Sequence, residues 1–231
     1  VTNLYGYSAL LLVILTFGME TTFFRFANKE NAHPDKVFST SGLTVGMVAL
    51  AFVLLVTLFL HPIASALNYA AHPEYVEIMA IIVALDAFQS ILFARLRYEN
   101  KALKFAALKL LFIVLNIGLN LFIFLAAPNL KESQPALMRW YNPDYQVGYI
   151  FVINLICTSL VTFGFIPELK KLRHGIDKNV LKQMLAYTWP LLLLGLAGIL
   201  NQVADKICYR FIVPGQEGEV LIQCNDTKHP L

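Results

Sequence analysis

The chain has 231 residues, of which 14% are charged and 58% are hydrophobic, and its formal net charge is +3. Ordinary soluble domains carry roughly 25% charged residues, because their exterior must stay solvated. The composition therefore excludes a soluble domain of this size, as well as disordered, collagen-like and disulfide-rich chains, and it favours an integral membrane protein.

Long segments without Asp, Glu, Lys or Arg run through the sequence. They cover residues 1–19, 37–73, 110–130, 145–167 and 183–204. Each is close to or longer than the roughly 20 apolar residues that one transmembrane helix needs. A sixth apolar segment is interrupted only by Asp86. The solidly apolar runs favour helices over the alternating strands of a β-barrel. The expected helices cover residues 3–25, 42–66, 76–97, 106–127, 146–166 and 187–209.

The predicted fold class is all-α, a polytopic membrane helix bundle with six transmembrane helices over residues 1–215. A short polar tail follows over residues 216–231. We expect this chain to be truncated. It begins with Val1, and its first helix would have an outside N-terminus without an upstream helix or a signal peptide. The tail suggests truncation or a frame change at the other end.

Basic residues alternate between the connections that join the predicted helices. The five successive connections hold 3, 0, 5, 2 and 5 Lys or Arg residues, so 13 lie on one side and 2 (Lys131 and Arg139) on the other. The positive-inside rule predicts that the basic connections are cytoplasmic and that residue 1 and the tail lie outside. Basic residues beside membrane spans indicate membrane lipids rather than nucleic acid as partners.

Asp86 stands at the centre of its predicted helix and begins a polar stripe. Gln89, Ser90, Phe93 and Arg97 follow it at helical spacing. Because ionisable groups in the bilayer are costly, such a group needs a partner, a wet cavity or an interface. In the functional interpretation, the stripe lines a cavity or binds a coupling cation, H⁺ or Na⁺. In the structural one, Asp86 hydrogen-bonds to a neighbouring helix and fixes packing.

Other charged or polar residues also lie within predicted spans. Glu20 is expected to pair with Arg25 or with an arginine of another helix, or else to extend to the membrane interface. Gln202, Asp205 and Lys206 lie in the last helix, where Lys206 either contacts an anion or reaches the outer interface. We find no metal-ligand spacing and no catalytic or phosphate-binding motif, so we expect no cofactor, no metal and no enzymatic activity.

Several motifs resemble one family of transporters. The motifs are YGYS at residues 5–8, FGMETTFFRF at 17–26, ALDAF at 84–88, ARLRYENK at 94–101, YTWPL at 187–191 and ADKICYR at 204–210. In this order they resemble the polysaccharide (lipopolysaccharide O-antigen) flippases, the Wzx-like branch of the multidrug/oligosaccharidyl-lipid/polysaccharide exporter superfamily. The resemblance covers the chain to about residue 220.

This resemblance implies a partial lobe of an exporter with 12 to 14 helices around a central cavity. It implies transport of a lipid-linked oligosaccharide across the bacterial inner membrane by alternating access. The substrate head is a diphosphate, so the cavity would need cationic and hydrogen-bonding groups. The family-like charged positions are Glu20, Arg25, Asp86, Arg95, Asp205 and Lys206.

Other functions remain as alternatives. A drug or cation antiporter of the same superfamily would use Asp86 as its cation site. A membrane-embedded enzyme acting on lipid-linked sugars is disfavoured, because the longest outer connection has about 20 residues and only two basic residues. A non-functional truncated product is the last alternative.

Overall fold

The computed structural model describes residues 2–29, 33–66, 72–126 and 146–212. For residues 2–7, 66, 126, 146–147, 174 and 199–212 it describes the backbone only. The predicted connection at 128–145 and the tail at 216–231 lie outside these ranges. Helices in chain order are α1 Thr2–Thr16, α2 Met19–Ala27, α3 Pro34–Leu58, α4 Leu60–Ala66, α5 Pro73–Tyr98, α6 Ala102–Leu121, η1 Phe122–Ala126, α8 Gln146–Phe163, α9 Ile166–Leu169, η3 Lys170–His174 and α10 Lys178–Ile212.

The described part of the chain is all-α. Five helical segments are long and apolar enough to cross a membrane, and a bent pair makes a sixth if it is counted as one span. The segments are Ser8–Ala27, Pro34–Leu58, Pro73–Tyr98, Ala102–Leu125 and Lys178–Gly198, with Gly148–Phe163 and Ile166–Arg173 as the bent pair. The chain is thus a multi-pass helical membrane protein.

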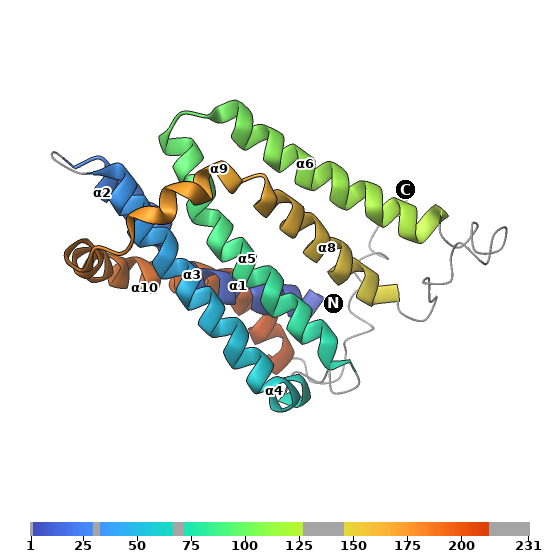
Figure 1. Cartoon of the computed structure of the whole chain (residues 1–231). Helices are drawn as coiled ribbons and strands as arrows, with labels where there is room; N and C mark the ends of the chain where they lie inside the picture. Colours follow the sequence, from blue (N-terminus) through green and yellow to red (C-terminus); the bar gives the residue numbers. More distant parts are fainter. Residues whose placement is uncertain (1, 30–32, 67–71, 127–145, 213–231) are drawn as a thin grey trace, which may run out of the picture.

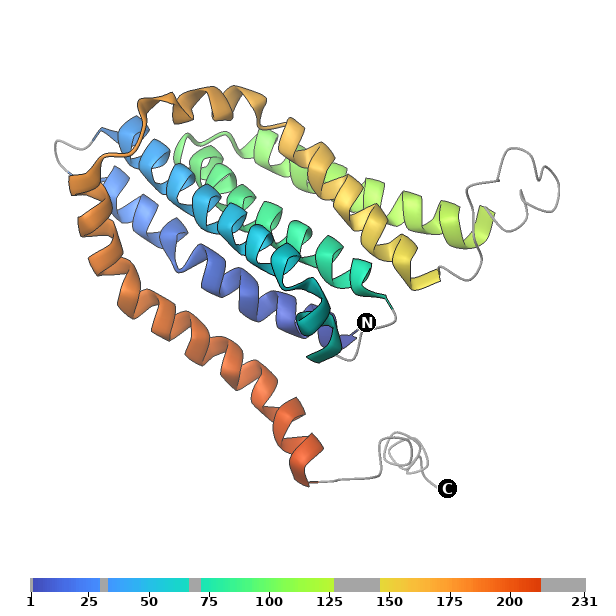
Figure 2. The ribbon, with the colours of Figure 1, turned by 60° about the horizontal axis from the view of Figure 1, so that its bottom comes forward.

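Helix α5 lies at the centre of the bundle, with α1 and α3 on one side and α6 and α8 on the other (Figures 1 and 2). In the most apolar 18-residue stretch of α5, 61% of the residues are buried. In the corresponding stretch of the span that contains α6, 11% of the residues are buried. Helix α10 packs against α1 and α2 at the edge of the bundle. The polar stripe therefore lies on the helix with the most neighbours.

Large apolar side chains cover much of the outer surface. Those at least 60% exposed are Leu50, Leu54, Leu58, Leu103, Leu110, Val114, Leu125, Phe163, Trp189 and Leu194. A soluble protein rarely exposes so many large apolar groups on one surface, whereas lipid chains solvate them well. The outer surface is therefore suited to contact with lipid.

Two prolines explain two of the differences from the helix ranges expected from sequence. The other differences are that the expected 3–25 helix is divided at Gly18 into α1 and α2, and that α3 and α10 begin at Pro34 and Lys178 rather than at 42 and 187. We expected single helices at 42–66 and 146–166. Helix α3 instead ends at Leu58, four residues before Pro62, and α8 ends at Phe163, four residues before Pro167. A proline ring clashes with the carbonyl of the residue four positions earlier and supplies no N–H to it. After Phe163 the chain bends by 59° into α9 and η3.

The turn between α5 and α6 is fixed by a helix cap. Asn100 has φ 54°, in the left-handed region. The N–H groups of Asn100 and Lys101 donate to the carbonyl groups of Arg97 (3.1 Å) and Leu96 (2.9 Å). This pair of bonds is the Schellman motif, which satisfies the free carbonyls at a helix end. The tight turn brings the start of α6 back alongside the polar end of α5.

Candidate functional site

A cavity of about 370 Å³ with both apolar and charged walls lies on one face of α5, between α1 and α2 on one side and α6 and α8 on the other. Its lining residues are Leu12, Glu20, Asp86, Gln89, Ser90, Phe93, Arg97, Phe105, Lys109, Phe112 and Val161. All five members of the predicted α5 stripe are among them. Helical spacing places residues three, four, seven and eleven positions apart on one face, and this face meets the cavity.

Four charged side chains face this cavity, two of each sign. Arg97 forms an ion pair with Glu20, so the arginine partner expected for Glu20 comes from another helix and not from Arg25. Lys109 interacts electrostatically with Asp86, and its ammonium nitrogen lies 4.4 Å from the centre of the Phe93 ring. Each cation therefore faces a carboxylate.

Asp86 makes no hydrogen bond or close ion pair with another residue in the described part of the chain. It is half-buried and lines the cavity. The hydrogen-bonding role considered for it belongs to its neighbour Gln89 instead. Gln89 Nε2 donates to the backbone carbonyl of Thr158 and to Thr162 Oγ1, both at 2.8 Å, and so joins α5 to α8.

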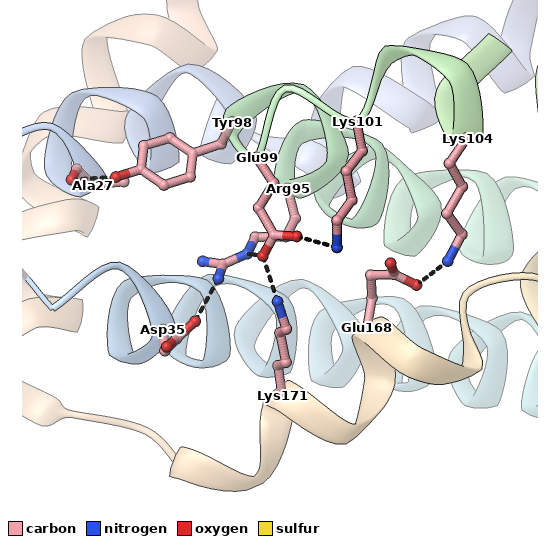
Figure 3. A network of polar contacts seen from close by, with 9 residues as sticks. All are labelled: Ala27, Asp35, Arg95, Tyr98, Glu99, Lys101, Lys104, Glu168 and Lys171. Carbon is pink, nitrogen blue, oxygen red and sulfur yellow. Dashed lines mark hydrogen bonds and ion pairs between the residues drawn. The ribbon is translucent and has the colours of Figure 1, made fainter.

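Arg95 does not line the cavity, although it was predicted as a site residue. It is 5% exposed and belongs to a network of charges at the end of α5 (Figure 3). Arg95 Nε donates to Glu99 at 2.6 Å, and its other end pairs with Asp35 of α3. Glu99 also accepts from Lys101 (2.6 Å) and from Lys171. This network connects α3, α5 and η3, which is a structural role.

Glu99 is held in its charged form by this network. Burial raises the pKa of its carboxyl, but hydrogen bonds from its cationic partners outweigh this effect and lower the pKa to about 2. Beside it, Lys104 of α6 pairs at 2.6 Å with Glu168 of α9, whose side chain is 2% exposed (Figure 3). These ion pairs hold the bent α9–η3 segment against the ends of α5 and α6.

The remaining predicted site residues lie apart from the cavity or outside the described side chains. The Arg25 guanidinium lies 4.1 Å from the centre of the Tyr187 ring and contacts α10 from α2. Gln202, Asp205 and Lys206 belong to α10, within the part described by its backbone only. The structure therefore brings together Glu20, Asp86 and Gln89 from the predicted set.

Lys109 was missed as a site residue. It was counted with the basic residues of a connection, but it lies three residues inside the predicted 106–127 helix and seven residues after the start of α6 at Ala102. A lysine within a span is a functional candidate by the same argument that selected Asp86. The signal was present in the sequence, whereas its partner on α5 depends on how the two helices pack.

The cavity combines two cations, two carboxylates, amide and hydroxyl groups and three phenylalanines. Such a surface suits an amphipathic molecule with a charged head. In the described side chains, no group of three or more His, Cys, Asp or Glu residues could hold a metal ion. The fold and cavity define a helical membrane protein with a charged cavity inside its bundle. No family model, curated protein or solved structure matches the chain.

Proposed function

We propose that the chain belongs to a transporter that moves a lipid-linked oligosaccharide across the bacterial inner membrane during polysaccharide biosynthesis, as in the O-antigen flippases that it resembles. The observation that carries this proposal is the cavity in which Arg97 and Lys109 stand beside phenylalanines. A diphosphate head would bind the two cations, while the lipid tail stays among apolar side chains. The basic ends of the helices would face the cytoplasm.

The charge pairs suggest how binding could be coupled to a cation. Arg97 and Lys109 already face Glu20 and Asp86. A diphosphate that bound the cations would leave one of these carboxylates without its partner. Because an uncompensated carboxylate in a bundle is costly, it would take up H⁺ or Na⁺. Substrate and cation would then be bound together, as symport requires.

A cation or drug antiporter is the second candidate. It is favoured by Asp86, whose carboxylate lines the cavity without a direct ion pair in the described part of the chain. In that case the carboxylate would bind the cationic substrate itself, and Lys109 would compete with it. The two candidates thus predict opposite effects of removing the lysine charge.

Flipping in proteoliposomes separates these candidates. The full-length transporter that contains this chain would be reconstituted with a fluorescent lipid-linked oligosaccharide, and the movement of that lipid followed by quenching from one side. We expect Lys109→Gln and Asp86→Asn each to slow flipping at least tenfold, since each removes about 1.4 kcal/mol or more from a charged contact. Lys29→Gln is the control, because Lys29 lies over the Phe26 ring and away from the cavity.

Each outcome decides between the functions. Equal flipping by wild type and both cavity variants would remove the cavity from the mechanism. No flipping, together with uptake of a cationic dye that increases in Lys109→Gln, would replace the flippase with the antiporter. Flipping that only the cavity variants lose would support the proposal.

A further inference from the structure

A second hollow lies at the basic end of the bundle, away from the central cavity. It has a volume of about 360 Å³ and is lined by Lys36, Gly175, Ile176, Asp177 and Lys178. Lys36 is in the first turn of α3, and Lys178 is the first residue of α10. The N-terminal ends of two helices that are far apart in sequence therefore each contribute one lysine to this hollow.

The hollow is built by contacts that clamp the linker before α10 onto α3. Ser39 Oγ lies within hydrogen-bond distance of the carbonyl oxygens of Leu172 (2.7 Å) and Gly175 (2.9 Å). The Asp177 N–H donates to Thr40 Oγ1 at 3.1 Å. The linker backbone is thus fixed before any ligand arrives, which lowers the entropic cost of binding.

The two lysines at the hollow have no ion-pair partner among the residues that the structure describes. Neither Lys36 nor Lys178 forms an ion pair with another described residue, and both are exposed. The carboxylate of Asp177 already accepts the N–H groups of Asn179 (2.9 Å) and Val180 (3.3 Å). Lys182 stands one turn after Lys178, and like charges at this spacing destabilise a helix. An anion at the hollow would relieve this repulsion.

The position of the hollow points to a lipid as the source of that anion. Lys36 and Lys178 each begin a helix that is apolar enough to span the membrane, so their ammonium groups lie at the depth of the lipid headgroups. Ile176, within the hollow, is 37% exposed and could reach the acyl chains below. A soluble anion gains nothing from such an apolar neighbour, whereas a phospholipid does.

We propose that the hollow formed by Lys36, Lys178 and the 175–177 backbone binds the phosphate of an anionic phospholipid headgroup. The exposed cations Lys170 and Arg173 of the neighbouring η3 add to the attraction of this surface for an anionic leaflet. The site is independent of the transported substrate, so this inference does not rest on the proposed function. It gives the bent α9–η3 segment a lipid that holds it at the membrane surface.

Lipid binding would be tested with the full chain in nanodiscs of phosphatidylcholine containing a spin-labelled or fluorescent phosphatidylglycerol. The double variant Lys36→Gln/Lys178→Gln should lose about fivefold in phosphatidylglycerol affinity for each lysine removed. The control is Lys29→Gln/Lys170→Gln, which removes two exposed charges from the same end of the bundle without touching the hollow. It should keep affinity within about twofold, because its lysines act only through the general field.

Equal losses in the two double variants would overturn the proposal and leave only a diffuse electrostatic attraction. Competition by millimolar inorganic phosphate at the hollow, with no preference for phosphatidylglycerol over phosphatidylcholine, would also overturn it in favour of a soluble anion. Thermal unfolding of both variants in detergent checks that they fold. A variant that fails to fold would be replaced by Lys36→Arg/Lys178→Arg, which should keep the lipid preference.

Discussion

Arg97 near the end of α5 forms an ion pair with Glu20 of α2, 77 residues earlier in the chain. The pair lies at the end of the central cavity nearest to the turn between α5 and α6. It joins α2 to α5 across that end. Because partly exposed ion pairs contribute little to stability, this contact holds that end of the cavity wall less firmly than packed apolar groups would.

The Glu20–Arg97 pair should add little to stability. Its side chains are 36% and 45% exposed, and exposed pairs contribute about 0–1 kcal/mol. We expect Glu20→Gln and Arg97→Gln each to lower the free energy of unfolding by less than about 1 kcal/mol. Their coupling, measured by a double-mutant cycle of unfolding in detergent, should be of the same size. A loss of about 3 kcal/mol or more for either variant would identify the pair as a main structural contact instead.

The Glu99 network should make stability depend on acidic pH. The ordinary pKa of a glutamate is 4.5, and in the folded chain that of Glu99 is about 2. A lowered folded pKa stabilises the protein above the unfolded value, and this stabilisation is lost as pH falls from about 4.5 towards 2. The difference corresponds to about 3 kcal/mol in favour of the charged form.

Unfolding of wild type and Glu99→Gln across this pH range tests that expectation. The variant should be less stable than wild type at pH 7, and the gap should close as pH approaches 2. Glu77→Gln removes a carboxylate from the other end of α5 and should keep the acid transition of the wild type. A gap that stays constant with pH would show that Glu99 acts through packing and not through its charge.

Removing only one partner of the Lys104–Glu168 ion pair should destabilise the protein more than replacing both partners together. Glu168 is 2% exposed, so Lys104→Ala leaves a buried carboxylate without its cation at a cost of about 3–5 kcal/mol. The double variant Lys104→Met/Glu168→Met should recover most of this loss. Leu103→Ala serves as the control, since Leu103 is the neighbouring residue and 88% exposed. If the double variant is as unstable as Lys104→Ala, the pair is not the source of the cost.

Gly18 should not tolerate a side chain. It lies between α1 and α2 with φ +69°, and a Cβ there would stand 2.8 Å from Leu191 Cβ of α10. The conformation and the overlap together predict a loss of about 1–3 kcal/mol for Gly18→Ala. Gly118→Ala is the matched control, because nothing lies within 4 Å of its Cβ position, and it should be neutral or stabilising. Similar effects of the two substitutions in thermal unfolding would contradict the predicted strain.

Membrane orientation can be measured by labelling single cysteines in intact cells. In a background where Cys157 is replaced by Ala, and Cys208 and Cys224 by Ser, a membrane-impermeant maleimide should label His72→Cys and not Lys170→Cys. The reason is that Lys170 belongs to a basic connection, which the positive-inside rule places in the cytoplasm. Permeabilised cells should label both positions. The reverse pattern in intact cells would invert the proposed topology.

Local rules account for the placement of the predicted stripe on one face of α5. The spacing of Asp86, Gln89 and Arg97 puts them on one face of any helix, whatever surrounds it. Arg95 shows the limit of that reasoning. It is two residues from Arg97 and so points to the opposite side of α5, where Asp35 and Lys171 bring in the rest of its network. The sequence contains both arginines but not the identity of the helices that cover each side.

The class of this protein followed from the sequence alone, because charge-free runs of about 20 residues dissolve only in a bilayer and must be helical there. The helix breaks before Pro62 and Pro167 also depend on local sequence, since a proline ring clashes with the carbonyl group of the residue four positions earlier. The tertiary structure alone decided which charges meet. Lys109 lines the same cavity as Asp86, and Lys36 and Lys178 line the same hollow, because contacts between helices depend on packing across the whole chain rather than on spacing within one helix.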